Sequence, residues 1–203
     1  SIPMIDIGPF LRPPRIPEGQ DLEAAKRATA RELEKACTEC GFFYVKNHGA
    51  DTALCNKAHE MARRFFSLPE EIKMKACVRQ DSDVGRGYQP VGKNVTLGKP
   101  DMHEALDLMV ELEREAAMSS SLGTILDTHP ELQPLVLGRN KWPSDKDVPH
   151  FKQTYDAYSS EMLRLGESVM RAMAVSLGLH EDFFQQGLTD KSFWVMRVIG
   201  YPP

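Results

Sequence analysis

The stretch Gly41-Phe42-Phe43-Tyr44-Val45-Lys46-Asn47-His48-Gly49 decides the fold of this chain. Five residues rich in aromatic and β-branched side chains lie between a glycine and a polar Asn-His-Gly turn, a pattern typical of a short buried strand. A helical pattern over residues 21–39 precedes the stretch, and Gly41 ends that helix. Another helical pattern begins at Asp51. The sequence therefore predicts a central strand with helices on both sides.

The composition predicts a soluble globular protein with a core of its own. The 203 residues are 41% hydrophobic and 27% charged, and the formal net charge is −4. This acidic balance argues against general nucleic-acid binding. No apolar run approaches the roughly 20 residues that a membrane-spanning helix needs, so we expect no membrane partner. The first residues lead straight into a strand-like pattern, so we expect no signal peptide.

The cysteines predict a reducing compartment and no metal site. Four cysteines are too few for a disulfide scaffold in a chain of this length, so we expect a cytoplasmic protein. Cys37 and Cys40, with His48 downstream, could suggest zinc. However, Leu33, Ala36 and the two cysteines fall on one helix face, where buried free cysteine behaves as a small hydrophobe. No second paired spacing completes a tetrahedral site, so no metal ligand is assigned.

The rest of the sequence combines helical patterns with a few strand patterns. Asp51 precedes a helix with an apolar stripe, and Pro69 opens a short helix. The longest apolar stripe, from Phe151 to Ala172, predicts a long helix lying under a sheet, and Gly178 ends it. Residues 79–100 are rich in glycine and proline and indicate mainly a loop. Four segments could form strands, the second of them a short edge strand: 2–7, 85–90, 103–109 and 193–201.

The last of these strand patterns is strongly apolar. No helix or turn pattern follows it, and complete domains rarely finish on an uncovered apolar strand. The long helices, with few strands to receive them, point the same way. We therefore expect the chain to be the N-terminal part of a larger protein.

Several short motifs occur in the order found in one enzyme family and cover essentially the whole chain. The strongest are the opening stretch 41–49 and Phe65-Phe66-Ser67-Leu68-Pro69-Glu70-Glu71-Ile72-Lys73. Weaker ones are Ile2-Pro3-Met4-Ile5-Asp6, Gly87-Tyr88, Glu104-Ala105-Leu106-Asp107, Trp142-Pro143, Leu177-Gly178-Leu179 and Met196-Arg197 to Tyr201-Pro202. With these motifs the chain resembles the isopenicillin N synthase-like family of non-haem iron(II), 2-oxoglutarate-dependent dioxygenases.

The resemblance implies an α+β fold. Members of this family have a double-stranded β-helix, or jelly roll, preceded by a helical and partly stranded N-terminal region. By resemblance, residues 1–192 are that N-terminal region and residues 193–203 are the first part of the jelly roll. Most of the jelly roll would then be absent from this chain.

The resemblance also implies Fe(II) and 2-oxoglutarate as cofactors, with O2 and a small organic molecule as substrates. The family binds iron with a His-x-Asp pair and a distant histidine, and clamps 2-oxoglutarate with Arg-x-Ser. His180-Glu181-Asp182 has the spacing of the pair but precedes the strand that should come before the metal site, so we reject it. We expect these cofactor ligands beyond Pro203 and assign no catalytic residue. The full-length protein would be a monomer or a weak oligomer. The alternative is a non-catalytic truncated or helical interaction protein on the same scaffold.

Four residues are candidates for contacts with substrate or cofactor. Arg197 and Tyr201 share one strand face and, by resemblance, lie near co-substrate or substrate; equally, Arg197 could pair with a structural acid and Tyr201 could be core. Asp107 lies where family members often contact substrate, although a solvated charge is the more ordinary reading. Tyr88 lies in a glycine-rich loop that could close over substrate.

Two nearby residues receive no binding role. Arg86 lies beside Tyr88, but its spacing differs from that of a substrate-binding arginine in some family members. His48 follows a strand in a turn, where its side chain can satisfy local backbone groups, so we interpret it as structural.

Overall fold

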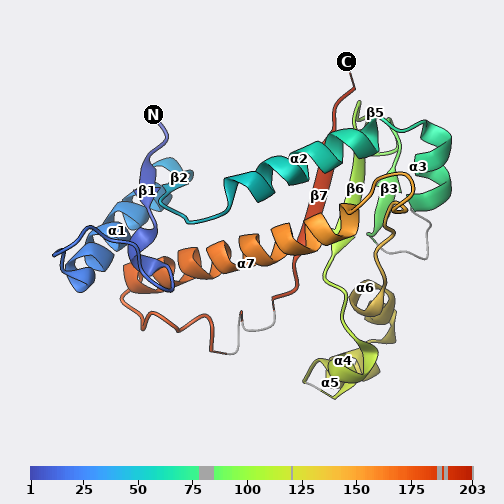
Figure 1. Cartoon of the computed structure of the whole chain (residues 1–203). Helices are drawn as coiled ribbons and strands as arrows, with labels where there is room; N and C mark the ends of the chain where they lie inside the picture. The colour runs from blue at the N-terminus through green and yellow to red at the C-terminus, as the bar shows by residue number, and fades with distance from the viewer. Residues whose placement is uncertain (78–84, 120, 187–188, 190–191, 203) are drawn as a thin grey trace. The chain divides into compact units, whose positions relative to one another are not determined.

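The computed structural model describes residues 1–77, 85–119, 121–186, 189 and 192–202 (Figure 1). The chain forms two compact units. The first unit comprises Ser1–Cys55 and Asp156–Ser192, and the second comprises Asn56–Tyr155 and Phe193–Pro203. The boundaries between them fall inside two helices, α2 (Thr52–Phe66) and α7 (Phe151–Ser176). Among the described residues no helix is both long enough and apolar enough to cross a membrane.

The first unit contains the predicted helix after Asp21. The Asp21 carboxylate accepts hydrogen bonds from the backbone N–H groups of Glu23 and Ala24, at 2.9 and 3.3 Å, and so caps helix α1 (Leu22–Lys35). A single π-helical turn, η2 (Ala36–Cys40), follows α1. Gly41 then ends the helix with φ of 75°, in the left-handed region that glycine adopts without strain. The predicted helix and its glycine end are confirmed.

The prediction that Cys37 and Cys40 lie on a buried helix face is wrong. Both thiols are exposed, whereas Leu33 and Ala36 of the same predicted face are buried. The π-helical turn holds more residues per turn than an α-helix, so the spacing that places four side chains on one stripe no longer applies after Ala36.

The sheet of the first unit has only two strands. Strands β1 (Met4–Asp6) and β2 (Tyr44–Lys46) run parallel beside α1 (Figure 1). Phe42 is 69% exposed and Tyr44 57%, so the predicted central buried strand is wrong. Because side chains alternate along a strand, only Phe43 and Val45 reach the core. The core residues of this unit also come from the 3-10 turn η1 (Gly8–Phe10), α1 and α7: Ile7, Phe10, Leu11, Leu33 and Ala172.

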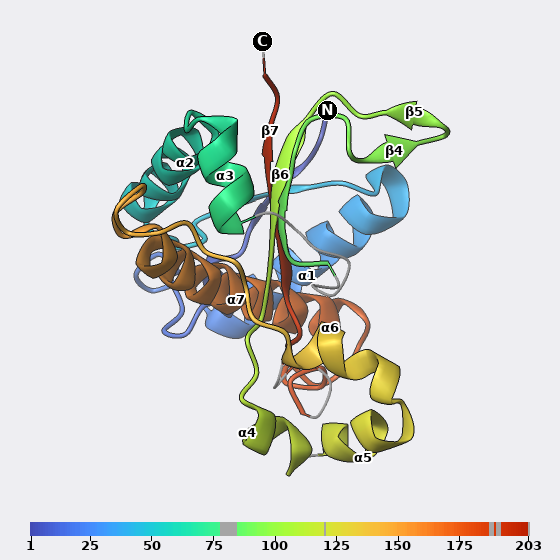
Figure 2. The same ribbon diagram turned by 90° about the vertical axis from the view of Figure 1, so that its right-hand side faces the viewer.

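The second unit contains a three-stranded antiparallel sheet in the order β3–β6–β7. Its strands are β3 (Gly87–Gln89), β6 (Glu104–Met109) and β7 (Val195–Gly200), which confirms three predicted strands. The central strand β6 is buried along its whole length. Helices α2 and α3 (Glu70–Cys77) lie on one side of this sheet, which is seen edge-on in Figure 2.

One prediction about this region is wrong. The segment with Arg86 and Tyr88 is no open loop, because these side chains are 0% and 1% exposed; the first part of the predicted loop, residues 79–84, lies outside the described residues. In strand β7 the apolar side chains of Val195 and Ile199 are 60% and 41% exposed. Among the described residues β7 pairs only with β6, so it is an edge strand.

Aromatic rings connect the helices of the second unit to its sheet. The Phe65 ring lies 5.7 Å from the rings of Tyr88 and of Phe151, and Phe151 stacks on Tyr155 at 4.6 Å. The Trp142 ring lies 6.3 Å from the Phe151 ring. The aromatic cluster therefore fixes α2 and the start of α7 against β3.

The remaining elements of the second unit are short. They are the hairpin β4 (Val95–Thr96) and β5 (Lys99–Pro100), and the helices α4 (Arg114–Met118), α5 (Ser121–Thr128), η4 (Pro130–Leu132) and α6 (Gln133–Leu137). The helices share a small core of Ala117, Leu126 and Val136. Buried Arg86 donates hydrogen bonds to the carbonyls of Leu135, at 2.6 Å, and Val110, at 3.1 Å, and so ties α6 to the residue after β6.

Candidate ligand-binding site

The face of the β3–β6–β7 sheet that carries Arg197 holds a connected polar cluster. Arg197 and Asp107 are directly opposite each other in the register of β7 and β6. Arg197 donates from Nε to Asp107 Oδ1 at 2.6 Å and from Nη2 to Oδ2 at 2.7 Å, which is a two-point ion pair. Gln89 on β3 also donates its amide N–H to Asp107 Oδ2. We call Gln89, Asp107 and Arg197 the open cluster.

The structure shows the partners of two of these residues. Asp107 is 3% exposed, so the reading of a solvated charge is wrong. The acid is separated by 90 residues from the arginine that neutralises it, and a single stretch of sequence does not show that pairing. Arg197 does pair with an acid, and this partner raises the pKa of its guanidinium. Whether Arg197 also contacts a ligand stays a prediction.

The open cluster reaches solvent at its β7 end. The Arg197 side chain is 40% exposed, in contrast to 4% for that of Asp107. Its neighbours on the same strand face, Val195 and Ile199, are apolar and exposed. Tyr201 follows them, 74% exposed, with its ring 5.7 Å from that of His103. Whether Tyr201 contacts a ligand or belongs to a core stays a prediction.

The opposite face of the sheet holds a second polar cluster, which is buried. Lys73 of α3 lies 2.6 Å from Glu104 Oε2, and the Tyr88 hydroxyl donates to the same oxygen at 2.6 Å. The side chains of Lys73 and Glu104 are 7% and 9% exposed. Burial, then the bond to Glu104, raises the pKa of Tyr88. We call Lys73, Glu104 and Tyr88 the closed cluster. Tyr88 as a ligand contact stays a prediction, and its hydroxyl is occupied by Glu104.

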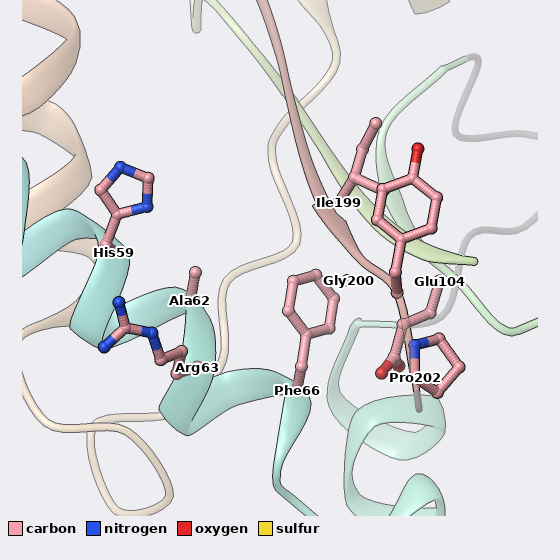
Figure 3. A pocket seen from close by; sticks show the side chains of 9 residues that line it. His59, Ala62, Arg63, Phe66, Glu104, Ile199, Gly200 and Pro202 are labelled. Atoms are coloured by element: carbon pink, nitrogen blue, oxygen red, sulfur yellow. The ribbon is translucent and has the colours of Figure 1, made fainter.

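A shallow cavity of about 490 Å³ lies between α2 and the end of β7 (Figure 3). His59 and Arg63 extend from α2 on one side, Ile199 and Pro202 lie on the other, and Phe66 stands between them. One wall of the cavity thus carries the Arg63 guanidinium and the His59 ring, and the facing wall is apolar. Gly200 lines it where the chain comes close to α2, because a Cβ atom there would lie 2.9 Å from the Phe66 ring. The remaining lining residues are Ala62, Glu104 and Tyr201.

The two histidines considered in the sequence analysis, His48 and His180, form hydrogen bonds with nearby backbone groups. His48 Nδ1 accepts a hydrogen bond from the backbone N–H of Ala50 at 3.1 Å, as expected of a turn residue. His180 Nδ1 accepts from the backbone N–H of Asp182, whose carboxylate pairs with Arg12 at 2.5 Å. Within the described residues no three or more His, Cys, Asp or Glu side chains gather where they could hold a metal ion.

Sequence reasoning missed three residues of the two clusters: Lys73, Gln89 and Glu104. Each sits in a segment whose secondary structure was predicted, but its partner comes from another segment of the chain. The sequence did contain one indication of these partners. Glu104 and Asp107 lie in the same strand, which is rich in apolar residues, and an acid buried in such a strand needs a polar partner.

Comparisons with known proteins agree with the fold. Residues 2–145 match the family described as non-haem dioxygenase in morphine synthesis N-terminal. The chain is 38% identical over 203 residues to homoarginine-6-hydroxylase 2-ODD-C23 of Glycine max, covering all of this chain and 56% of that protein. It is 31% identical over 202 residues to 1-aminocyclopropane-1-carboxylate oxidase of Dictyostelium discoideum, covering all of this chain and 49% of that one.

Solved structures show the same arrangement of elements. A full-length Neurospora crassa protein in complex with alpha-KG superposes with a TM-score of 0.74 at 25% identity, over 99% of this chain and 54% of that chain. JOX2 in complex with 2OG, Fe and JA gives a TM-score of 0.66 at 26% identity, over 99% of this chain and 48% of that chain.

The chain belongs to the non-haem iron(II), 2-oxoglutarate-dependent dioxygenase family, as the resemblance predicted. It has an α+β fold, and its structural neighbours are jelly-roll oxygenases. The family uses Fe(II) and 2-oxoglutarate. The chain spans about half the length of the curated relatives it matches.

Proposed function

We propose that this chain is the N-terminal region of an iron(II)- and 2-oxoglutarate-dependent dioxygenase that oxidises an amino acid of the homoarginine type. The observation that carries the proposal is the match, over all or nearly all of the chain, to four homoarginine-6-hydroxylases at 34–38% identity. In this proposal residues 1–192 form the region that precedes the jelly roll, and residues 193–203 begin the jelly roll itself. The reading as a non-catalytic interaction protein is not favoured, because the relatives named above are enzymes.

The described residues do not by themselves fit an iron site, because they contain no group of three or more metal-ligating side chains. We therefore propose that iron and 2-oxoglutarate are held by residues outside this chain and supply the oxidation of a C–H bond there. No chemical step is assigned to a residue of this chain. The chain would contribute binding and orientation of the substrate instead.

The four predicted contact residues then divide by exposure. Arg197 and Tyr201 are exposed and are proposed to touch substrate or co-substrate directly. Asp107 is buried and is proposed to act by holding the Arg197 guanidinium. Tyr88 is buried against Glu104 and is proposed to act only through the closed cluster. A monomeric or weakly oligomeric state and a cytoplasmic location remain predictions.

The proposal is tested on the full-length protein with added Fe(II), 2-oxoglutarate and O2. Succinate formation is measured with homoarginine, with 1-aminocyclopropane-1-carboxylate and without a prime substrate. We expect iron-dependent succinate formation that homoarginine stimulates, together with a product that has gained one oxygen atom. Iron-dependent turnover that homoarginine does not stimulate would leave the enzyme class and refute the substrate. No turnover of 2-oxoglutarate under any condition would refute the class itself.

A further inference from the structure

We propose that Cys37 and Cys40 form a dithiol site at the end of α1, which a small disulfide such as glutathione disulfide converts to a disulfide within the chain. The site does not depend on the substrate proposed above, because the two cysteines belong to the first unit and the open cluster belongs to the second. Both cysteines are free, and both are exposed instead of buried. Access to solvent is the first requirement for a reactive thiol, and both thiols meet it.

The two cysteines are three residues apart within one helical turn. They belong to η2, which the Gly41 N–H closes by donating to the Ala36 carbonyl at 2.9 Å. Helical geometry places Cα atoms three residues apart at roughly 5 Å, inside the range of roughly 4.4–6.8 Å that a disulfide spans. The Cβ atoms of such a pair are roughly 5–6 Å apart and must approach to about 4 Å. A small change within this turn therefore brings the two sulfur atoms into bonding distance.

The turn can tighten without loss of core contacts. Residues 37–42 are all exposed, and none of them belongs to the hydrophobic core of the first unit. The Thr38 hydroxyl, between the two cysteines, donates to the carbonyls of Glu34 at 2.9 Å and Lys35 at 3.3 Å, so the turn is held to α1 from its middle. Movement of the Cys37 and Cys40 side chains toward each other leaves the buried residues of α1 in place.

The other two cysteines of the chain differ from this pair. Cys55 is partly buried and Cys77 is buried. Burial, and then the nearby Asp147, raises the pKa of the Cys77 thiol to about 12. Since the thiolate is the form that attacks a disulfide, Cys77 is almost inert at neutral pH. Reaction with a small disulfide should therefore be confined to the exposed pair.

The proposed reaction is a thiol–disulfide exchange in two steps. The thiolate of one cysteine attacks a sulfur of glutathione disulfide, whose S–S bond breaks while a mixed disulfide forms, and the released glutathione thiolate takes up the proton that the cysteine lost. The thiolate of the other cysteine then attacks the cysteine sulfur of the mixed disulfide and releases the second glutathione, which is protonated in the same way. The two cysteine thiols are oxidised to a disulfide, and glutathione disulfide is reduced to two glutathione thiols.

The test uses the reduced full-length protein, incubated with glutathione disulfide and then treated with iodoacetamide to block the remaining thiols. Trypsin cleaves after Lys35 and Lys46, so both thiols are recovered on one peptide, residues 36–46, which contains no other cysteine. Mass spectrometry distinguishes this peptide with both sulfurs alkylated, with glutathione attached, or with an internal disulfide, which is lighter by two hydrogen atoms. The proteins are the wild type, Cys37→Ser, Cys40→Ser and the control Cys55→Ser.

We expect the wild type and Cys55→Ser to give the peptide with the internal disulfide, and dithiothreitol to reverse its formation. Cys37→Ser and Cys40→Ser lack the second thiol, so their reaction should stop at the mixed disulfide. Their peptide should then carry at least about tenfold more glutathione than the wild-type peptide. Because both positions are exposed, serine should not disturb the fold, and the result for the wild type depends on no variant.

Three results would overturn the inference. If iodoacetamide alkylates neither thiol in the native reduced protein, the pair is covered in the full-length chain. If the wild-type peptide retains glutathione at the level of the single variants, the second thiol does not reach the first and the two react independently. If Cys55→Ser abolishes oxidation of the wild-type kind, the disulfide joins one of the two cysteines to Cys55 and not to its neighbour.

Discussion

Both faces of the β3–β6–β7 sheet neutralise a buried acid of β6, but the two faces differ in how exposed the neutralising cation is. Each face carries one acid of β6, and each acid meets a cation and a neutral polar side chain. In the closed cluster Glu104 meets Lys73 and Tyr88, and all three are buried. In the open cluster Asp107 meets Arg197 and Gln89, but the cation remains 40% exposed.

The difference teaches how to separate a structural ion pair from a candidate binding group. Pairing with an acid does not distinguish them, because both cations are paired. The two cations differ instead in their remaining N–H donors and in their exposure. Lys73 also donates to the Phe66 carbonyl at 3.1 Å and its side chain is buried. The Arg197 side chain is 40% exposed, so one edge of its guanidinium stays uncovered. We therefore expect the closed cluster to determine stability and the open cluster to determine ligand affinity.

The largest effect on stability is expected in the closed cluster. Glu104→Gln removes the charge that compensates Lys73 and leaves a buried ammonium without a counter-ion. This should lower the free energy of unfolding by about 3–5 kcal/mol. Urea unfolding of the full-length protein measures the loss, with Glu32→Gln on the exposed side of α1 as the control.

The double variant Lys73→Met/Glu104→Gln sharpens this prediction. It removes both buried charges, so it should be more stable than Glu104→Gln alone. A single variant that loses less than about 1 kcal/mol would show that the pair is not buried in the way described.

A smaller loss of stability is expected in the open cluster. Asp107→Asn also removes a buried charge, but Arg197 can turn toward water, so its charge is not trapped. We expect a loss of about 1–2 kcal/mol, below that of Glu104→Gln in the same urea experiment. The reverse order would contradict the distinction between the two clusters.

The smallest effect is expected for a more exposed pair on α7. Arg164 donates to Glu161 at 2.7 and 3.1 Å, and this hydrogen bonding holds the pKa of Glu161 below its usual value. A depressed carboxyl pKa in the folded state contributes stability above the unfolded pKa, which is lost as the pH falls through the folded pKa.

Because these side chains are 21% and 37% exposed, we expect a contribution of less than about 1 kcal/mol. Unfolding free energies of wild type and Glu161→Gln, measured from about pH 6 to pH 3, should converge at the acid end. A constant difference across that range would mean that the pair does not titrate as described.

The sequence predicted local structure better than it predicted partners. The helix after Asp21, its glycine end at Gly41 and the strand around Asp107 follow from capping, left-handed φ and strand composition, which are properties of neighbouring residues. The predicted burial of Cys37 is wrong because the π-helical turn contains one extra residue, which moves the side chains after it away from the apolar helix face. The exposed side chain of Phe42 was missed because a short two-stranded sheet covers one face only.

The candidate site shows the same limit. Asp107 and Arg197 were both singled out, but as separate residues, because the register that makes them neighbours depends on the pairing of β6 with β7. Gln89 was not singled out, because nothing near it in the chain indicates a buried acid as its partner. The residue types therefore indicated which side chains belong to the candidate site. The pairing of the strands was needed to distinguish the side chain proposed to touch a ligand from those that hold it in place.

The most direct test of this account is a double-mutant cycle on Asp107 and Arg197 in the full-length protein, with kcat/KM for the proposed substrate as the readout. If Asp107 acts by holding Arg197, each single variant, Asp107→Asn and Arg197→Met, lowers kcat/KM by about tenfold or more. Once Arg197 is methionine, Asp107→Asn should then cause little further loss. Losses that multiply in the double variant would contradict the account, because the two residues would then act independently.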